Sequence, residues 1–170
     1  YLNISEIKEL RQKLPKNCLL VIDAAYSEYV TNNDYNNSLS LAKTRSDIIV
    51  THTFSKIFGI PSLRLGWAFC PEKVIVNLNK IRPAFNINSY AQKAGIEALE
   101  DKKHVKQSIL HNTEWKKWLE NNIQNLGLKI QPSVANFVLI KFKNRIDATN
   151  CAKFLEKNNI QTRVVFTGNI

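Results

Sequence analysis

Three short apolar runs, with helical patterns before and after them, limit the fold of this chain more than any other feature. Residues 18–23, 48–51 and 65–70 have the length and character of strands that are covered on both faces of a sheet. Before and after them, apolar residues recur at helical spacing over 5–14 and 72–81. Strands that alternate with helices predict an α/β sheet in the first part of the chain.

The starts of three helices are predicted from capping residues. Ser5 is expected to cap the first helix, which Pro15 ends. Ser89 and Gln92 have the spacing of a capping box, so a helix is expected from there to about residue 99. Asp147 is expected to cap a helix in the last part of the sequence.

The second half of the sequence predicts a long helix followed by a small α+β unit. A broad apolar face runs over 103–126, and Gly127 stands where a helix C-terminal cap belongs. Strands are expected over 136–142 and 160–165, with the helix capped by Asp147 between them.

The charge balance indicates a basic surface. The 170 residues include 24 Lys and Arg against 14 Asp and Glu, a net charge of +10. Because the lysines are spread along the chain without a block of like charges, a solvated surface is favoured, and phosphorylated ligands fit the sign. A nucleic-acid-binding domain is the non-enzyme alternative, and only the net charge supports it.

Several classes of protein find no support in the sequence. The three cysteines are far apart and form no C-x-x-C pair, so we expect reduced thiols and a cytoplasmic protein. No apolar run is long enough to span a membrane. Because the chain begins with Tyr1 and contains no methionine, we expect it to be part of a longer protein. No metal site is expected, since the histidines lack ligand spacing and are interpreted as ordinary surface or core residues: His52, His104 and His111.

Three residues carry the first indications of chemistry. Asp23 closes an apolar strand, and ligands of open α/β sheets bind beyond the carboxyl ends of strands. Tyr26 follows three residues later. Lys56 comes after the second strand among small and apolar residues, where loss of hydration makes an amine more nucleophilic. Ordinary alternatives remain for each: a strand-end acid, a packed aromatic and a solvent-facing lysine.

A second group of residues suits a phosphate. Thr53, Ser55 and Arg64 offer two hydroxyls and a guanidinium, which binds phosphate oxygens through two parallel bonds. Together with Lys56 and Asp23 they match the needs of pyridoxal phosphate. A lysine amine joins its aldehyde, an acid keeps its pyridine nitrogen protonated, and hydroxyls and an arginine hold its phosphate.

This order of residues resembles the fold-type I aminotransferases: Asp-x-x-Tyr, then Ser-Lys-x-x-Gly, then an arginine eight residues after the lysine. Longer segments resemble the histidinol-phosphate aminotransferases, in the same order along nearly the whole chain: "THTFSKIFGIPSLRLGW", "RPAFNINSYAQKAGIEALED", "HNTEWKKWLE" and "PSVANFVLIKF". Ala24 departs from the acidic residue usual in that family, and Pro61 from its Gly or Ala.

The resemblance implies a division of the chain into three parts. Residues 1–102 would be the C-terminal part of the large cofactor domain, with its mixed or parallel sheet. Residues 103–126 would form a bridging helix, and 127–170 part of a small C-terminal α+β domain.

The resemblance also implies roles for residues of the cofactor site. Lys56 would carry the cofactor and move the proton of the substrate's α carbon. Asp23 would pair with the pyridine nitrogen, and Tyr26 would bond the ring's phenolic oxygen. Ser55 and Arg64 would hold the phosphate.

Three further residues have weaker assignments. Thr53 would assist at the phosphate, and Arg163 and Asn136 would lie near the substrate. A structural hydrogen bond is the alternative for Asn136.

The activity implied by the resemblance is amino transfer between histidinol phosphate and 2-oxoglutarate, which gives imidazole acetol phosphate and glutamate. It also implies a homodimer, with no nucleic-acid or membrane partner. Alternatives are an aromatic aminotransferase, a threonine-phosphate decarboxylase or an inactive aminotransferase-like interaction protein. Because the family's glycine-containing phosphate cup, stacking aromatic and C-terminal arginine are not found here, we expect these 170 residues not to catalyse alone.

Overall fold

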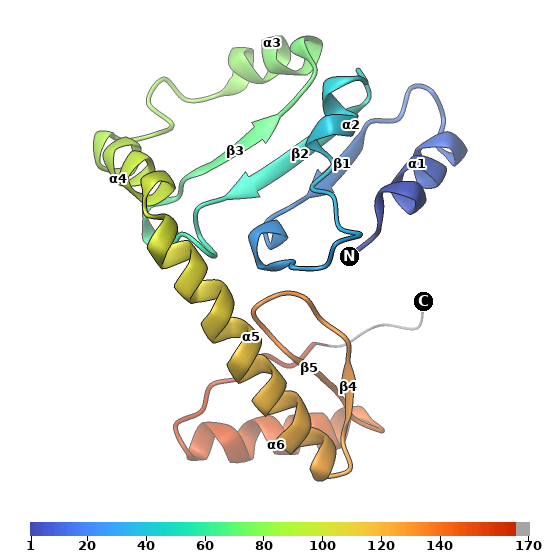
Figure 1. The fold of residues 1–170 in the computed structure, drawn as a ribbon, viewed down its shortest axis with the longest axis vertical. Coiled ribbons are helices and arrows are strands. Elements are labelled where there is room, and N and C mark those ends of the chain that lie inside the picture. The colour runs from blue at the N-terminus through green and yellow to red at the C-terminus, as the bar shows by residue number, and fades with distance from the viewer. Residues whose placement is uncertain (166–170) are drawn as a thin grey trace. The chain divides into compact units, whose positions relative to one another are not determined.

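The computed structural model describes residues 1–165, which form parts of two compact units (Figure 1). The first unit holds Tyr1–Thr113 together with Val134–Asn136, and the second holds Glu114–Ser133 and the chain from Phe137 onward. The boundary falls within the long helix α5, Lys102–Asn125. The division at residues 102 and 126 stays a prediction.

The first unit is built on a three-stranded mixed sheet in the order β1-β2-β3. Strand β1 (Leu20–Asp23) runs parallel to β2 (Ile48–Thr53), and β3 (Gly66–Phe69) runs antiparallel to β2. All three predicted strands are confirmed, with bounds that shift by one or two residues. The α/β fold class with a mixed sheet is confirmed as well.

The core of this unit lies on one face of β2. Ile48 and Val50 are fully buried, and they pack with Ala24 and Ala42. Ala42 belongs to α2 (Leu39–Lys43), which covers this face of the strand. Burial of each large aliphatic side chain contributes roughly 1.5–3 kcal/mol, so β2 is held firmly in the centre of the sheet.

The expectation that all strands are covered on both faces is wrong for β1 and β3 within the described residues, since Gly66, Trp67 and Ala68 of β3 are exposed. Val21 is 57% exposed, whereas its neighbours Leu20 and Ile22 are half-buried against the core. β1 is an edge strand in the part of the chain that the structure describes, and the exposed Val21 lies beside the buried Ile49 of β2.

Asn3 caps the first helix, α1 (Ile4–Lys13), whereas Ser5 was the predicted cap. The Asn3 side chain accepts from Glu6 N at 3.0 Å, and the Glu6 carboxylate accepts from Asn3 N at 2.7 Å. This reciprocal pair is a capping box that satisfies two backbone donors. The prediction failed because Glu6 lies three residues after Asn3 and leaves Ser5 inside the helix.

The same correction applies to two later helices. Asn88 caps α4 (Ser89–Glu100) by accepting from Ala91 N at 2.9 Å, so Ser89 is the first helical residue. Asn144 caps α6 (Arg145–Lys157) and accepts from Asp147 N at 2.9 Å. In each case an asparagine oxygen, one of the best capping acceptors, stands one to three residues earlier than predicted. The predicted helix α3 (Glu72–Ile81) is confirmed.

The second unit contains the end of α5, a two-stranded sheet and α6. Strand β4 (Lys129–Gln131) pairs antiparallel with β5 (Leu139–Lys141). Gly127 ends α5 with φ +76°, and its N–H donates to Gln124 O at 2.8 Å, as predicted for a C-terminal cap.

Two strand predictions for this unit need correction. The strand expected over 136–142 is reduced to β5, and β4 was not predicted. The strand expected over 160–165 is wrong, because these residues lie outside any strand. Their β-branched side chains favour a strand only when a neighbouring strand offers backbone hydrogen bonds. Within residues 1–165, β4 and β5 pair only with each other.

Candidate active site

The predicted cofactor residues of the first unit gather at one edge of its sheet. Asp23 is the last residue of β1, and Thr53 is the last residue of β2. Because the two strands are parallel and Asp23 is in register with Thr51, their carboxyl ends meet. The Thr51 hydroxyl donates to Asp23 Oδ1 at 3.5 Å, and Ala25 N donates to the same oxygen at 3.0 Å. The exposed carboxylate is therefore fixed through one oxygen from two directions.

The sheet face beside Asp23 carries small side chains. Ala68 and Gly66 of β3 are in register with Thr51 and Thr53, so these four residues share the face with Asp23. A Cβ added to Gly66 would lie 2.9 Å from the His52 carbonyl oxygen, so a side chain there would require the backbone to move. Gly66 and Ala68 are both exposed, which leaves this face open to a flat ligand.

Lys56 is in a tight turn that follows β2. Gly59 N donates to Lys56 O at 3.0 Å, and Gly59 adopts φ +72°. The side chains of Phe54 and Ile57 on either side are 5% and 2% exposed, and they anchor the turn in the unit. The Lys56 side chain is half-buried, and its Nζ lies 5.1 Å from the centroid of the Tyr26 ring. At this distance the ammonium is attracted by the ring face.

The predicted phosphate ligands form a group on the same segment. Arg64 Nη1 donates to Ser55 Oγ at 3.4 Å and to Pro61 O at 2.7 Å. Thr53 Oγ1 accepts from Ser55 N at 3.0 Å, so both hydroxyls belong to one hydrogen-bonded segment. Arg64 has φ +53°, a left-handed conformation that is unfavourable for a residue with a side chain. Backbone strain of this kind concentrates at ligand sites.

Asn136 lies in the first unit and bonds to Tyr29. Burial raises the pKa of the Tyr29 phenol, and the hydrogen bond from Asn136 opposes that shift, as does the positive charge of Lys56. Tyr29 belongs to the short 3-10 helix η1 (Ser27–Tyr29), which directly follows Tyr26. This contact is the structural hydrogen bond considered for Asn136, and its role at a substrate stays a prediction.

Arg163 belongs to the second unit. It is exposed and lies outside helices and strands. Its proximity to a substrate therefore stays a prediction.

One residue of the site region was not predicted from the sequence, and a second was predicted only as an ordinary surface or core histidine. Thr51 contacts Asp23, and it was detectable because it stands two residues before Thr53 on the same face of a strand. His52, buried on the opposite face, stacks on Trp67 with 4.3 Å between ring centroids. Its Nδ1 is 3.2 Å from Glu28 Oε1, so it connects β2 to η1. No local pattern predicts that contact.

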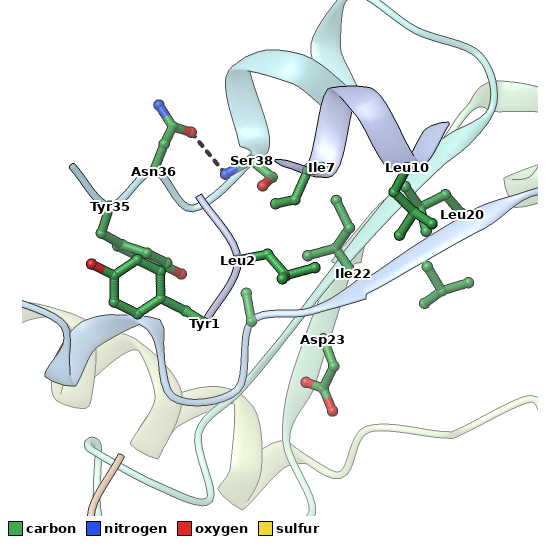
Figure 2. A pocket seen from close by; sticks show the side chains of 12 residues that line it. Tyr1, Leu2, Ile7, Leu10, Leu20, Ile22, Asp23, Tyr35, Asn36 and Ser38 are labelled. Atoms are coloured by element: carbon green, nitrogen blue, oxygen red, sulfur yellow. Dashed lines mark hydrogen bonds between the residues drawn. The ribbon is translucent and has the colours of Figure 1, made fainter. Parts of the chain in front are cut away.

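An apolar pocket of about 280 Å³ lies against β1 on the side of α1 (Figure 2). Leu2, Ile7 and Ile22 line it, and the Tyr1 ring packs edge-on to Tyr35 at its mouth. Figure 2 shows the Asp23 carboxylate pointing away from these aliphatic side chains. Asp23 is itself one of the lining residues, so the pocket adjoins the strand end that carries this carboxylate.

Two further classes of site are absent from residues 1–165. None of the helices there is both long and apolar enough to cross a bilayer. That part of the chain also holds no group of three or more His, Cys, Asp or Glu side chains placed to bind a metal ion.

An α/β unit with a lysine, a carboxylate and an arginine-hydroxyl pair at one sheet edge is typical of enzymes that bind a phosphorylated aldehyde cofactor. The aminotransferase class I and II family matches residues 1–168, and the chain belongs to this family. Within it, the chain is similar to histidinol-phosphate aminotransferases, as the sequence resemblance implied.

Curated relatives support this placement. The histidinol-phosphate aminotransferase of Nitrobacter winogradskyi is 46% identical over 84% of this chain and 39% of its own length. That of Nitrobacter hamburgensis is 43% identical over 97% of this chain and 46% of its own length. The chain thus spans less than half the length of these curated relatives.

Solved structures support the fold. The histidinol-phosphate aminotransferase of Sinorhizobium meliloti, in complex with pyridoxal-5'-phosphate, gives a TM-score of 0.85 at 24% identity over 96% of this chain and 45% of its own. L-threonine-O-3-phosphate decarboxylase of Porphyromonas gingivalis gives 0.68 at 22% identity, over 94% of this chain and 49% of its own. The fold-type I aminotransferase architecture is confirmed.

Proposed function

We propose that the protein is a pyridoxal-phosphate-dependent aminotransferase that exchanges an amino group between histidinol phosphate and 2-oxoglutarate. One observation carries the proposal: the Lys56 amine lies 5.1 Å from the Tyr26 ring, on the segment that also holds the Ser55–Arg64 pair. The identity of 40–48% to several histidinol-phosphate aminotransferases supports the choice of substrate.

The donor groups of the first unit fit the proposed cofactor. Pyridoxal phosphate, when bound, supplies an aldehyde that amines attack and an aromatic ring that withdraws electrons from neighbouring bonds. The chain offers an amine, Lys56, for the aldehyde and a carboxylate, Asp23, for the pyridine nitrogen. Arg64 and Ser55 offer N–H and O–H donors for the phosphate, with Thr53 beside them.

Each residue then has a physical task in the reaction. Lys56 Nζ would hold the cofactor through its aldehyde and would carry the proton that leaves the substrate's α carbon. The Asp23 carboxylate would keep the proton on the pyridine nitrogen. The Tyr26 hydroxyl would donate to the phenolic oxygen of the ring, and Arg64 with Ser55 would orient the phosphate.

The proposal extends to the whole protein's partners. Histidinol phosphate and imidazole acetol phosphate form one substrate pair, and glutamate and 2-oxoglutarate form the other. Arg163 and Asn136 are proposed to lie near the substrate. We also propose a cytoplasmic homodimer that binds neither nucleic acid nor membrane.

Attachment of the cofactor to one lysine tests the proposal. Full-length protein is mixed with pyridoxal phosphate and reduced with borohydride, and the modified peptide is located by mass spectrometry. We expect the label on Lys56 and none after Lys56→Ala. Lys73→Ala, which changes an exposed lysine of α3, serves as the control and should keep the label.

Turnover tests the substrate. Histidinol phosphate, phenylalanine and threonine phosphate are compared with the full-length enzyme, and we expect the highest kcat/KM for histidinol phosphate. Lys56→Ala should lower kcat about 10²–10⁴-fold, the range for loss of a proton-transfer group. Turnover of threonine phosphate alone would make the protein a decarboxylase, and a label on another lysine would end the proposal.

A further inference from the structure

His104 reaches across the first unit to the turn that carries Lys56. It lies in the first turn of α5, and its Nε2 is 2.9 Å from the carbonyl oxygen of Ile57, a residue 47 positions earlier in the chain. Ile57 directly follows Lys56, so this contact is made one residue from the proposed cofactor lysine.

The chemistry of the contact fixes which ring nitrogen carries a proton. A carbonyl oxygen only accepts, so Nε2 must carry the hydrogen and donate it. A neutral ring satisfies this requirement. The Ser108 hydroxyl, one helical turn further on, is 3.4 Å from the same nitrogen. His104 is therefore a donor to the backbone of the turn.

The position of the imidazole is set by the start of its helix. Asp101 Oδ1 accepts from His104 N at 2.8 Å, the pattern of a residue that caps a helix. This bond holds the His104 backbone in place. The side chain then needs no rearrangement to meet Ile57.

The ring also lies near the far end of the turn. A Cβ built on Gly59 would lie 3.5 Å from His104 Nε2 and 3.7 Å from Cε1, which is ordinary contact distance. Gly59 N closes the turn by donating to Lys56 O at 3.0 Å. His104 thus bonds to the turn at Ile57 and lies near Gly59, two residues that follow the lysine.

We propose that His104 is a positioning residue for Lys56. By donating to Ile57 O, it holds the turn over 56–59 closed and keeps the lysine stem directed at the Tyr26 ring. The effect on the turn stands on the geometry alone, and the effect on catalysis rests on the proposed aminotransferase function.

Three variants of the full-length protein distinguish the effect of the N–H donor of His104 from the effect of its ring shape. His104→Gln keeps an N–H donor at a similar reach, and His104→Phe keeps a flat ring without a donor. Lys106→Ala changes an exposed residue of the same helix and is the matched control.

The first measurement needs no cofactor. Hydrogen exchange of the Gly59 and Ile60 amides is followed by mass spectrometry of the peptides that span the turn. Loss of one neutral hydrogen bond should raise their exchange rate about fivefold in His104→Phe. His104→Gln and Lys106→Ala should stay within about twofold of the wild type. Equal exchange in all four proteins would overturn the proposal.

The second measurement uses the cofactor. His104→Phe should attach pyridoxal phosphate to Lys56 about fivefold more weakly and lower kcat by a similar factor, with KM within about twofold. His104→Gln should restore both. If His104→Phe speeds exchange but leaves attachment and kcat unchanged, the residue is only structural and the inference fails. If the wild type attaches no cofactor at all, the proposed function fails, and the exchange measurement still decides whether His104 holds the turn.

Discussion

Two glycines with the same left-handed backbone conformation but different neighbours make a matched pair for a test. Gly59 and Gly127 have φ values of +72° and +76°, in the left-handed region that L side chains rarely adopt. Gly59 closes the turn after Lys56 in the first unit, and Gly127 ends α5 in the second. A Cβ on Gly59 would meet only the His104 ring, at 3.5 Å, and one on Gly127 would meet nothing within 4 Å.

The expected loss of stability is similar for the two alanine variants. A left-handed non-glycine residue costs about 1–2 kcal/mol, and the reduced entropy of the unfolded chain returns roughly 0.4–1 kcal/mol. Gly59→Ala and Gly127→Ala should therefore each lower the free energy of unfolding of the full-length protein by about 1 kcal/mol. Urea unfolding followed by circular dichroism measures this quantity.

The two variants should differ in cofactor attachment. A bias of about 1 kcal/mol against the closed turn displaces Lys56 in Gly59→Ala and should weaken retention of pyridoxal phosphate about fivefold. Gly127→Ala should bind it as the wild type does. The measurement is a titration of pyridoxal phosphate followed by its absorbance. Equal weakening in both variants, or none in Gly59→Ala, would refute the link between this turn and the cofactor.

Two further substitutions test the anion group and a structural ion pair. Arg64→Lys should weaken binding of pyridoxal phosphate about tenfold in a fluorescence titration, because a lysine cannot form the two parallel bonds of a guanidinium; unchanged binding would remove Arg64 from the phosphate site. The hydrogen bond from Arg45 holds the pKa of Asp47 below its ordinary value, with the charges of Arg45 and Arg11 in support. A lowered pKa means stability that is present above the unfolded-state pKa and is lost as the pH falls through the folded value. Asp47→Asn should therefore destabilise the protein at pH 7 and much less at about pH 3, as thermal unfolding at both pH values would show; an equal loss at the two pH values would contradict the assignment.

Local patterns were enough to predict the strands and helices with strong signals. The run from Ile48 needs no tertiary context, because a short buried strand is the simplest structure for it. Strand β4 was not predicted, because its three residues do not form an apolar run. Only Ile130 is half-buried, and the residues on either side of it are exposed. Helix starts were misplaced by one to three residues because Asn3, Asn88 and Asn144 accept the capping bonds.

The site was predictable where its residues are close in the chain or belong to one strand face. Ser55 and Arg64 meet because the loop between them is short, and their types suit one anion. The contact between His104 and Ile57 was not predictable, because residues 47 positions apart come together only through the packing of α5. Long-range contacts of this kind leave no periodic signal in the sequence.

One strand explains why the chemistry of this chain could be inferred from so few residues. Side chains of β2 alternate between two faces, so Val50 packs in the core and His52 meets Glu28 on one face. Thr51 and Thr53 point to the other face, where they bond to the Asp23 carboxylate and the Ser55 amide. Burial of β2 therefore fixes the register that aligns the carboxylate of β1 with the segment of Lys56. A slip of one residue would turn both threonines into the core, and their bonds to the Asp23 carboxylate and the Ser55 amide would be lost.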